Sequence, residues 1–216
     1  MSVNRDTLID NLEFSFHKNE VSTELIISVI DFIQKRGLKA IWHPVAGFIC
    51  LNIGSKGKDT YRLHIWHPNG IGIYSYHSWP IIHQHRWLLK SYVVKGKIIN
   101  NVYSVNHSSD NPTHSVYSVW HKNSEDLFVP SMKDVAIELE SSTTISTGQF
   151  YEIQQDEFHS TTQINTFIGA TLVRTTSMNS KSCVLGPVMG SIKPMNRIEC
   201  SLSQLNDSLE SLRSAI

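Results

Sequence analysis

Between residues 38 and 176 the chain alternates short apolar runs with turn-forming residues, and this pattern restricts the fold more than any other feature. Runs such as Tyr61 to Trp66 have the length and alternation typical of strands, because successive side chains of a strand point to opposite faces. Turn residues such as Pro68-Asn69-Gly70 separate the runs. Many short strands with turns between them indicate an antiparallel sandwich or barrel, so the fold class is predicted to be mainly β. We expect strands at 40–42, 48–51, 61–66, 71–76, 87–95, 97–105, 115–121, 135–139, 149–153 and 167–175.

Apolar residues at helical spacing occur at the two ends of the sequence. They predict amphipathic helices over 6–17, 22–36 and from Leu202 to Ile216. Ser22 or Thr23 suits the start of the second helix, and Gly37 suits its end. We expect the N-terminal helices to pack on the outside of the barrel. For the C-terminal helix, packing on the barrel and contact with a second copy of the chain both stay open.

The predicted elements divide the chain into three regions. Residues 1–37 form an N-terminal helical region, residues 38–176 the β-barrel, and residues 177–216 an irregular segment followed by the C-terminal helix. The segments 106–114 and 122–131 are rich in polar residues, and we expect both to be loops.

Charge and cysteine usage exclude several classes of protein. Lys plus Arg and Asp plus Glu both number 19, so no general attraction to nucleic acid or to an acidic membrane is expected. No run of 18 apolar residues occurs, and the first residues lead into no signal-peptide core. The three cysteines are scattered and fit a reducing compartment. We expect a cytoplasmic protein.

Three histidines are candidate metal ligands. His83 and His85 are two residues apart, and in an extended strand they would point to the same face. A third, His159, follows the turn-like run Gln154 to Glu157 about seventy residues on. If the fold brings the three imidazoles together, they bind one ion and leave other positions open.

The segments around these histidines resemble the two motifs of the cupins. The first motif, G-x5-H-x-H-x3-E-x6-G, is matched by His83, His85 and Gly96, and the second, G-x5-P-x-G-x2-H-x3-N, by Gly148 and His159. The resemblance covers roughly residues 40–176 and implies a jelly-roll barrel with a metal inside. The other motif positions are replaced, by His77, Leu89, Gln154, Asp156 and Gln163.

Leu89 stands where most cupins have a glutamate ligand. Three neutral imidazoles leave the charge of a divalent ion to be balanced by the substrate, which favours an anionic, chelating molecule. Cysteine dioxygenase and its relatives are the cupins with a three-histidine iron site, and that resemblance implies Fe(II). Imidazole also suits zinc, nickel and copper, and manganese is not excluded.

Five further residues are candidates for the reaction. Arg62 shares a strand face with His64 and follows a tyrosine, as a substrate-binding arginine does in cysteine dioxygenase, so we expect it to hold a carboxylate. Arg174 and Tyr92 are further candidates for substrate binding. His64 and Tyr151 are candidates for proton transfer, although a hydrogen-bonded barrel residue is the alternative for each.

The sequence thus predicts a non-haem Fe(II) dioxygenase of the cupin class, with a small anionic thiol or carboxylate and dioxygen as its reactants. A metal-dependent lyase or isomerase of the same fold is one alternative. A metabolite-binding domain without catalysis, in which the histidines are structural, is the other. A second copy of the chain is the one macromolecular partner we expect.

Overall fold

The computed structural model of the chain describes residues 4–43, 47–66, 82–122, 125–164, 167–177, 182–188 and 190–216, with only the backbone of His43. These ranges contain helices α1 (Arg5–Lys18), α2 (Thr23–Arg36) and α3 (Leu202–Ala215). All strand pairs are antiparallel, as the sequence predicted. The strands are β1 (Ala40–His43), β2 (Phe48–Lys56), β3 (Asp59–Trp66), β4 (His83–Gln84), β5 (Trp87–Lys95), β6 (Lys97–Asn106), β7 (His114–Lys122), β8 (Glu125–Ser146), β9 (Phe150–Ile153), β10 (Phe158–Gln163), β11 (Gly169–Ser177), β12 (Cys183–Gly186), β13 (Lys193–Asn196) and β14 (Ile198–Glu199).

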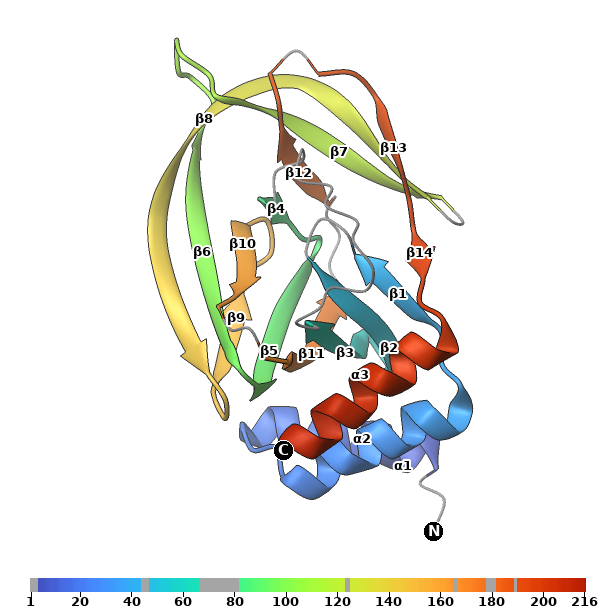
Figure 1. The fold of residues 1–216 in the computed structure, drawn as a ribbon. Coiled ribbons are helices and arrows are strands. Elements are labelled where there is room, and N and C mark those ends of the chain that lie inside the picture. The colour runs from blue at the N-terminus through green and yellow to red at the C-terminus, as the bar shows by residue number, and fades with distance from the viewer. Residues whose placement is uncertain are drawn as a thin grey trace.

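Two sheets face each other (Figure 1). The first sheet has the order β14-β1-β2-β3-β11-β5-β9, and the second has the order β13-β8-β6-β10-β4-β12-β7. Strand β8 also pairs with β7, so the second sheet closes on itself. The mainly β fold is confirmed, and the arrangement is consistent with a cupin-like barrel or sandwich with flanking helices.

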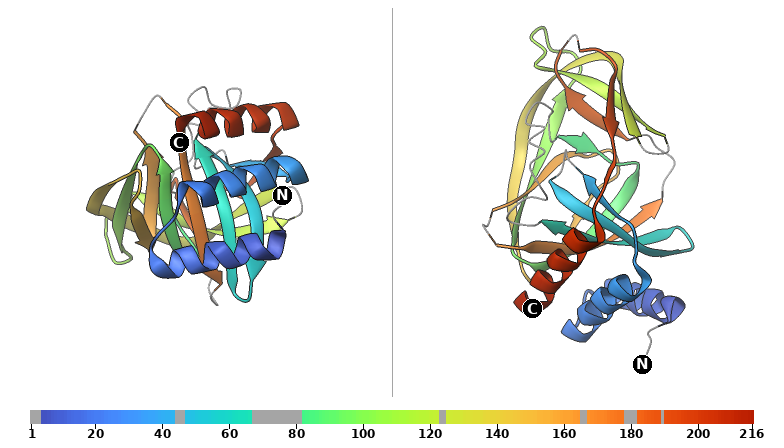
Figure 2. Two further views of the ribbon diagram at one scale, coloured as in Figure 1. Left: turned by 90° about the horizontal axis from the view of Figure 1, so that it is seen from below. Right: turned by 45° about the vertical axis from the view of Figure 1, so that its right-hand side comes forward.

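The three helices lie against the outer face of the first sheet (Figure 2). Their apolar faces and the outward side chains of that sheet form one buried core, which includes Phe16, Ile30, Tyr61, Leu63 and Leu209. The Ser22 hydroxyl accepts a hydrogen bond from the Leu25 backbone N–H, and Gly37 ends α2 at φ 57°. This confirms the predicted caps. None of the helices in the described ranges is long and apolar enough to cross a membrane.

Two glycines of the motif pattern form neighbouring turns. Gly96, between β5 and β6, has φ 95°, and Gly148, between β8 and β9, has φ 87°. A side chain is disfavoured at both angles, which explains why the positions are glycine. The Thr147 backbone N–H donates to the Gly96 carbonyl at 3.1 Å, and the Gly148 N–H donates to the Val93 carbonyl at 2.9 Å. The two turns therefore hold β5, β6, β8 and β9 together.

Two expected irregular segments contain strands. The segment 122–131 was expected to be a loop, but β8 begins at Glu125 and continues for 22 residues. The segment 177–200 was expected to be irregular, but it contains β12, β13 and β14. The barrel therefore extends beyond residue 176. Strands β12, β13 and β14 are short and pair with distant parts of the chain, so they carry little local signal. Strand β8 is long, but its first residues follow a polar stretch and were interpreted as part of a loop. The predicted strand at 71–76 lies outside the described residues.

Leu209→Ala tests the packing of α3. Leu209 is fully buried in the core, whereas Leu202 on the same helix is 61% exposed. Removal of a buried leucine side chain leaves a cavity, and we expect a loss of about 2–4 kcal/mol in the free energy of unfolding, measured by urea denaturation. Leu202→Ala is the control and should change it by less than about 0.5 kcal/mol. Equal effects of the two substitutions would show that α3 does not pack on the sheet.

Candidate metal centre

Three histidine side chains meet inside the barrel. His83 on β4 and His159 on β10 are direct partners in the pairing of these two strands, and their ring centroids are 4.4 Å apart. The ring of His85 lies 4.7 Å from that of His83 and 5.0 Å from that of His159. One nitrogen of each ring lies within 4.8 Å of the others, so together they can hold one ion. The structure thus brings together the predicted ligand set.

The two motif segments are also joined through the backbone. The two-residue spacing predicted that His83 and His85 lie in one strand. Strand β4 ends at Gln84, however, so His85 lies just outside it. Its carbonyl oxygen instead accepts a hydrogen bond from the backbone N–H of Asp156 at 3.2 Å. Asp156 has φ 62°, and it occupies the position of a glycine in the cupin motif. The aspartate therefore keeps the left-handed turn that directs the chain into His159.

The protonation of the histidines suits metal binding. His159 is 1% exposed, and its Nδ1 lies 3.1 Å from the Glu157 carbonyl oxygen, which accepts the ring hydrogen. Its Nε2 is then free to bind an ion. Burial, together with the neighbouring His83, lowers the pKa of His159 to about 3. Burial and the other two histidines hold the pKa of His85 well below its ordinary value. Neutral imidazoles are the form that binds metals.

No carboxylate joins the three histidines among the described residues. The residues that the structure does not describe include neither aspartate nor glutamate, so they cannot supply a carboxylate ligand either. Leu89, at the motif's glutamate position, is 6% exposed and packs with Ile153 and Val173. The side of the centre where cupins have a charged ligand is apolar in this chain.

The histidines lie on the wall of a cavity of about 570 Å³ between the two sheets. Arg62, His64 and Tyr151 from the first sheet line the same cavity. Burial raises the pKa of Tyr151 to about 12, although a hydrogen bond with Ser91 opposes this shift. The Tyr151 hydroxyl therefore keeps its proton at neutral pH.

Arg62 is a positive charge without a carboxylate partner. Its Nη1 donates to the Thr175 hydroxyl at 3.0 Å, and its guanidinium carbon lies 5.2 Å from the ring of Trp87. No ion pair joins it to an acid among the described residues, and the remaining ranges contain no acid. Burial raises the pKa of the neighbouring Cys50 thiol to about 11, although Arg62 opposes this, so Cys50 supplies no negative charge.

Two of the predicted substrate-binding residues lie away from this cavity. Arg174 pairs with Tyr61, and Tyr92 pairs with Leu172, both in the register that faces the helices. The Arg174 guanidinium lies 6.0 Å from the ring of Phe16, and the Tyr92 ring 4.9 Å from that of Phe150. This corrects the expectation that they share the pocket of Arg62. The sequence did not define which face of the sheet carries these two side chains. Side chains alternate between the two faces along a strand, and the pairing register of the sheet decides which set points inward.

Trp87 has a larger part in the site than the sequence indicated. Its ring packs against the apolar cluster of Leu89, Ile153 and Val173, and it also stacks on His85 at 5.1 Å and 16°. The same ring is the one that Arg62 lies over. Trp87 therefore contacts both a metal ligand and the unpaired cation. Its position two residues after the H-x-H pair was the only signal in the sequence.

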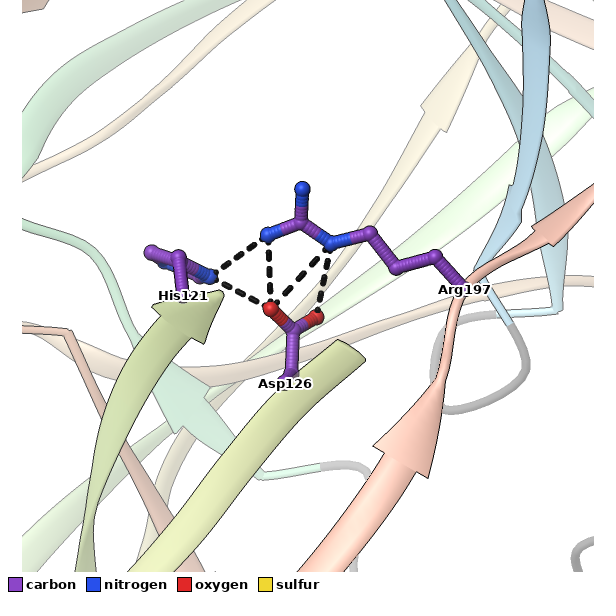
Figure 3. A network of polar contacts seen from close by, with 3 residues as sticks. All are labelled: His121, Asp126 and Arg197. Atoms are coloured by element: carbon purple, nitrogen blue, oxygen red, sulfur yellow. Dashed lines mark hydrogen bonds and ion pairs between the residues drawn. The ribbon is translucent and has the colours of Figure 1, made fainter. Parts of the chain in front are cut away.

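A polar network at another part of the cavity wall was not predicted (Figure 3). Arg197, between β13 and β14, donates to both carboxylate oxygens of Asp126, and its Nη2 lies 2.6 Å from Oδ1. The Nδ1 of His121 lies 2.6 Å from the same oxygen. His121, the second-last residue of β7, is exposed and is also a partner of Asp126. The network joins the β7–β8 hairpin to the connection between the two sheets.

No protein-family model matches the chain, and no curated protein matches it. Among the solved structures, hydroquinone 1,2-dioxygenase PnpCD in complex with Cd²⁺ and 4-hydroxybenzonitrile is similar at 7% identity and a TM-score of 0.35. The match covers 59% of this chain and 63% of that chain, so this chain spans less than two thirds of the neighbour's length.

Trp87→Leu tests the support of His85. An aliphatic side chain cannot stack on the imidazole, and we expect Zn²⁺ affinity, measured by competition with a chelator, to fall by about 10–100-fold. The Trp87 indole nitrogen has no hydrogen-bond partner among the described residues, so the substitution removes no hydrogen bond within them. Trp120→Leu, at a residue that is 58% exposed, is the control. Unchanged affinity in Trp87→Leu would show that the stack does not orient His85.

Asp126→Asn tests the polar network. Burial raises the pKa of Asp126, but hydrogen bonds from His121 and Arg197 outweigh it and lower the pKa from 3.8 to about 2. A depressed carboxyl pKa stabilises the fold above pH 3.8, and this stabilisation is lost as the pH falls toward 2. We expect Asp126→Asn to cost about 2 kcal/mol of unfolding free energy at pH 7, with the difference shrinking between pH 4 and 2.

Asp10→Asn is the matched control, because the Asp10 side chain is 60% exposed in its ion pair with Lys56. It should change the unfolding free energy by less than about 1 kcal/mol. A difference between wild type and Asp126→Asn that stays constant from pH 7 to pH 2 contradicts the assigned role of Asp126.

Proposed function

We propose that this chain is a metal-dependent oxygenase of the cupin class, with Fe(II) held by His83, His85 and His159. Its substrate is a small anionic molecule, a carboxylate or a thiol. The observation that carries the proposal is the convergence of three imidazoles, without a carboxylate among the described residues, on a cavity that also contains an unpaired arginine. The resemblance to the cupin motifs supports the choice of reaction.

The donor set fits the proposed ion. Imidazole nitrogen is a good ligand for Fe(II), and three neutral ligands leave the positive charge to be balanced by an anionic substrate. When bound, iron supplies the redox chemistry by which dioxygen reacts with an organic molecule. The protein's own part is to bind the substrate, to orient it and to exclude water.

Arg62 is the proposed anchor of the substrate. A guanidinium forms two parallel hydrogen bonds with a carboxylate, and in a partly buried site this pairing fixes both position and orientation. Arg62 and His85 both contact the ring of Trp87, so a carboxylate on Arg62 is held near the metal ligands. Leu89, Ile153 and Val173 form an apolar wall that excludes water beside them.

Tyr151 and His64 are the proposed proton-transfer residues. Because the Tyr151 hydroxyl is protonated at neutral pH, it donates a hydrogen bond or a proton and does not act as a base. His64 stacks on Phe48 at 4.1 Å on the wall of the same cavity. These two groups also support a second candidate, a metal-dependent lyase or isomerase, which needs proton transfer and no dioxygen.

His159→Ala tests the proposed centre. Loss of one of three ligands should reduce the iron content, measured after anaerobic loading with Fe(II), to less than about one-tenth of wild type, and activity should fall with it. His107→Ala, at an exposed histidine, is the control for imidazole lost elsewhere. Normal iron loading in His159→Ala contradicts the assignment.

Oxygen consumption separates the two candidate reactions. The iron-loaded protein is supplied with a panel of thiols and carboxylates in an oxygen electrode, and product is analysed with and without air. An oxygenase consumes dioxygen in proportion to product formed. Turnover of a panel member at the same rate without air supports the lyase or isomerase instead.

A further inference from the structure

We infer that the substrate of this site has one carboxylate, held by Arg62, on a flat, apolar body of about a dozen to twenty non-hydrogen atoms, and is not an amino-acid thiol. This inference rests on the proposed function and narrows its substrate class. Three observations carry it: the volume of the cavity, the aromatic side chains on its walls and the pairing of its charges.

The volume of about 570 Å³ is too large for a small thiol. A water molecule takes about 30 Å³ in the liquid, so the space corresponds to roughly twenty of them, or about as many non-hydrogen atoms of a ligand. Cavities of this size are typical of ligands much larger than an amino acid. A cysteine molecule would leave most of the space to water, beside a centre whose own walls are apolar.

Aromatic rings line the cavity from two strands of the first sheet. Phe48 on β2 stacks on His64 of β3 at 4.1 Å and 16°, and the ring of Trp66 meets Phe48 at 5.1 Å and 63°. Trp87 and Tyr151 are further aromatic residues of the wall and pack against one apolar cluster. Aromatic surfaces prefer to contact other flat rings by stacking or edge-to-face packing. The walls therefore favour a planar body over a puckered one of equal size.

The charges of the cavity match one carboxylate. Of its basic residues in the described ranges, Lys39 pairs with Glu199 at 3.1 Å and Arg197 pairs with Asp126. Arg86 is exposed to solvent. Arg62 is partly buried and has no acidic partner, as shown above. Apart from the metal ion, a second negative charge on the ligand would therefore meet only cations that are already neutralised or hydrated.

The experiment is a set of titrations of the Zn²⁺-loaded protein, which binds ligands without oxidising them. The probe is 4-phenylbutanoate. Its matched comparators are 4-cyclohexylbutanoate for flatness, 4-phenylbutanamide for charge and L-cysteine for size. Binding is measured by calorimetry and by the change in tryptophan fluorescence, since three tryptophans line the cavity in the described ranges.

We expect 4-phenylbutanoate to bind at least about tenfold more tightly than each comparator. Arg62→Gln should remove the preference for the acid over the amide and keep the preference for the phenyl over the cyclohexyl ring. Phe48→Leu should do the reverse. Arg36→Gln, at an exposed arginine on α2, is the control and should change neither preference.

Tightest binding of L-cysteine, or equal binding of the phenyl and cyclohexyl acids, overturns the inference and leaves the metal centre standing. Failure of the protein to take up Zn²⁺ overturns the proposed function. In that case the same titrations on the metal-free protein still measure both preferences, because Arg62 and the aromatic wall belong to the protein. Loss of either preference there overturns the inference as well.

Discussion

The pairing of β4 with β10 is the constraint on which the candidate site depends. It places His83 directly opposite His159, although 75 intervening residues separate them in the sequence. Neither strand is long, and each is held from both sides, β10 by β6 and β4 by β12. The hydrogen bond from Asp156 to His85 adds the third ligand to this pair. Backbone pairing thus brings together the three side chains of the candidate metal centre.

The electrostatics of the cavity follow from the replacement of one carboxylate by Leu89. Without a negative ligand, a metal ion on the histidines would favour an anion in the space between the sheets, as the Arg62 guanidinium does. The other cationic side chains of the wall in the described ranges are paired, as Lys39 and Arg197 are, or exposed to solvent, as Arg86 is. Arg62 therefore determines where that anion lies. Trp87 connects the histidine cluster with Arg62. Its ring stacks face to face on His85 and makes a cation–π contact with Arg62.

The sequence predicted the residues with strong local or motif signals and missed those that depend on distant partners. Helix caps at Ser22 and Gly37 are local chemistry, and both were confirmed. Strand β12 has four residues and forms only because β4 and β7 flank it, so no local sequence pattern predicts it. The facing of Arg174 depended on the register of β11, which the sequence does not define.

By itself, the sequence determined that the chain is mainly β, with helices at its ends, and that three histidines have the spacing of a cupin metal centre. These properties follow from alternation, capping and short-range spacing, which act within a few residues. Only the tertiary structure decided that Arg62 has no counter-ion, that Trp87 supports His85 and that Arg174 and Tyr92 face the helices. Such facts depend on which strands become neighbours, and that choice is made by burial over the whole barrel.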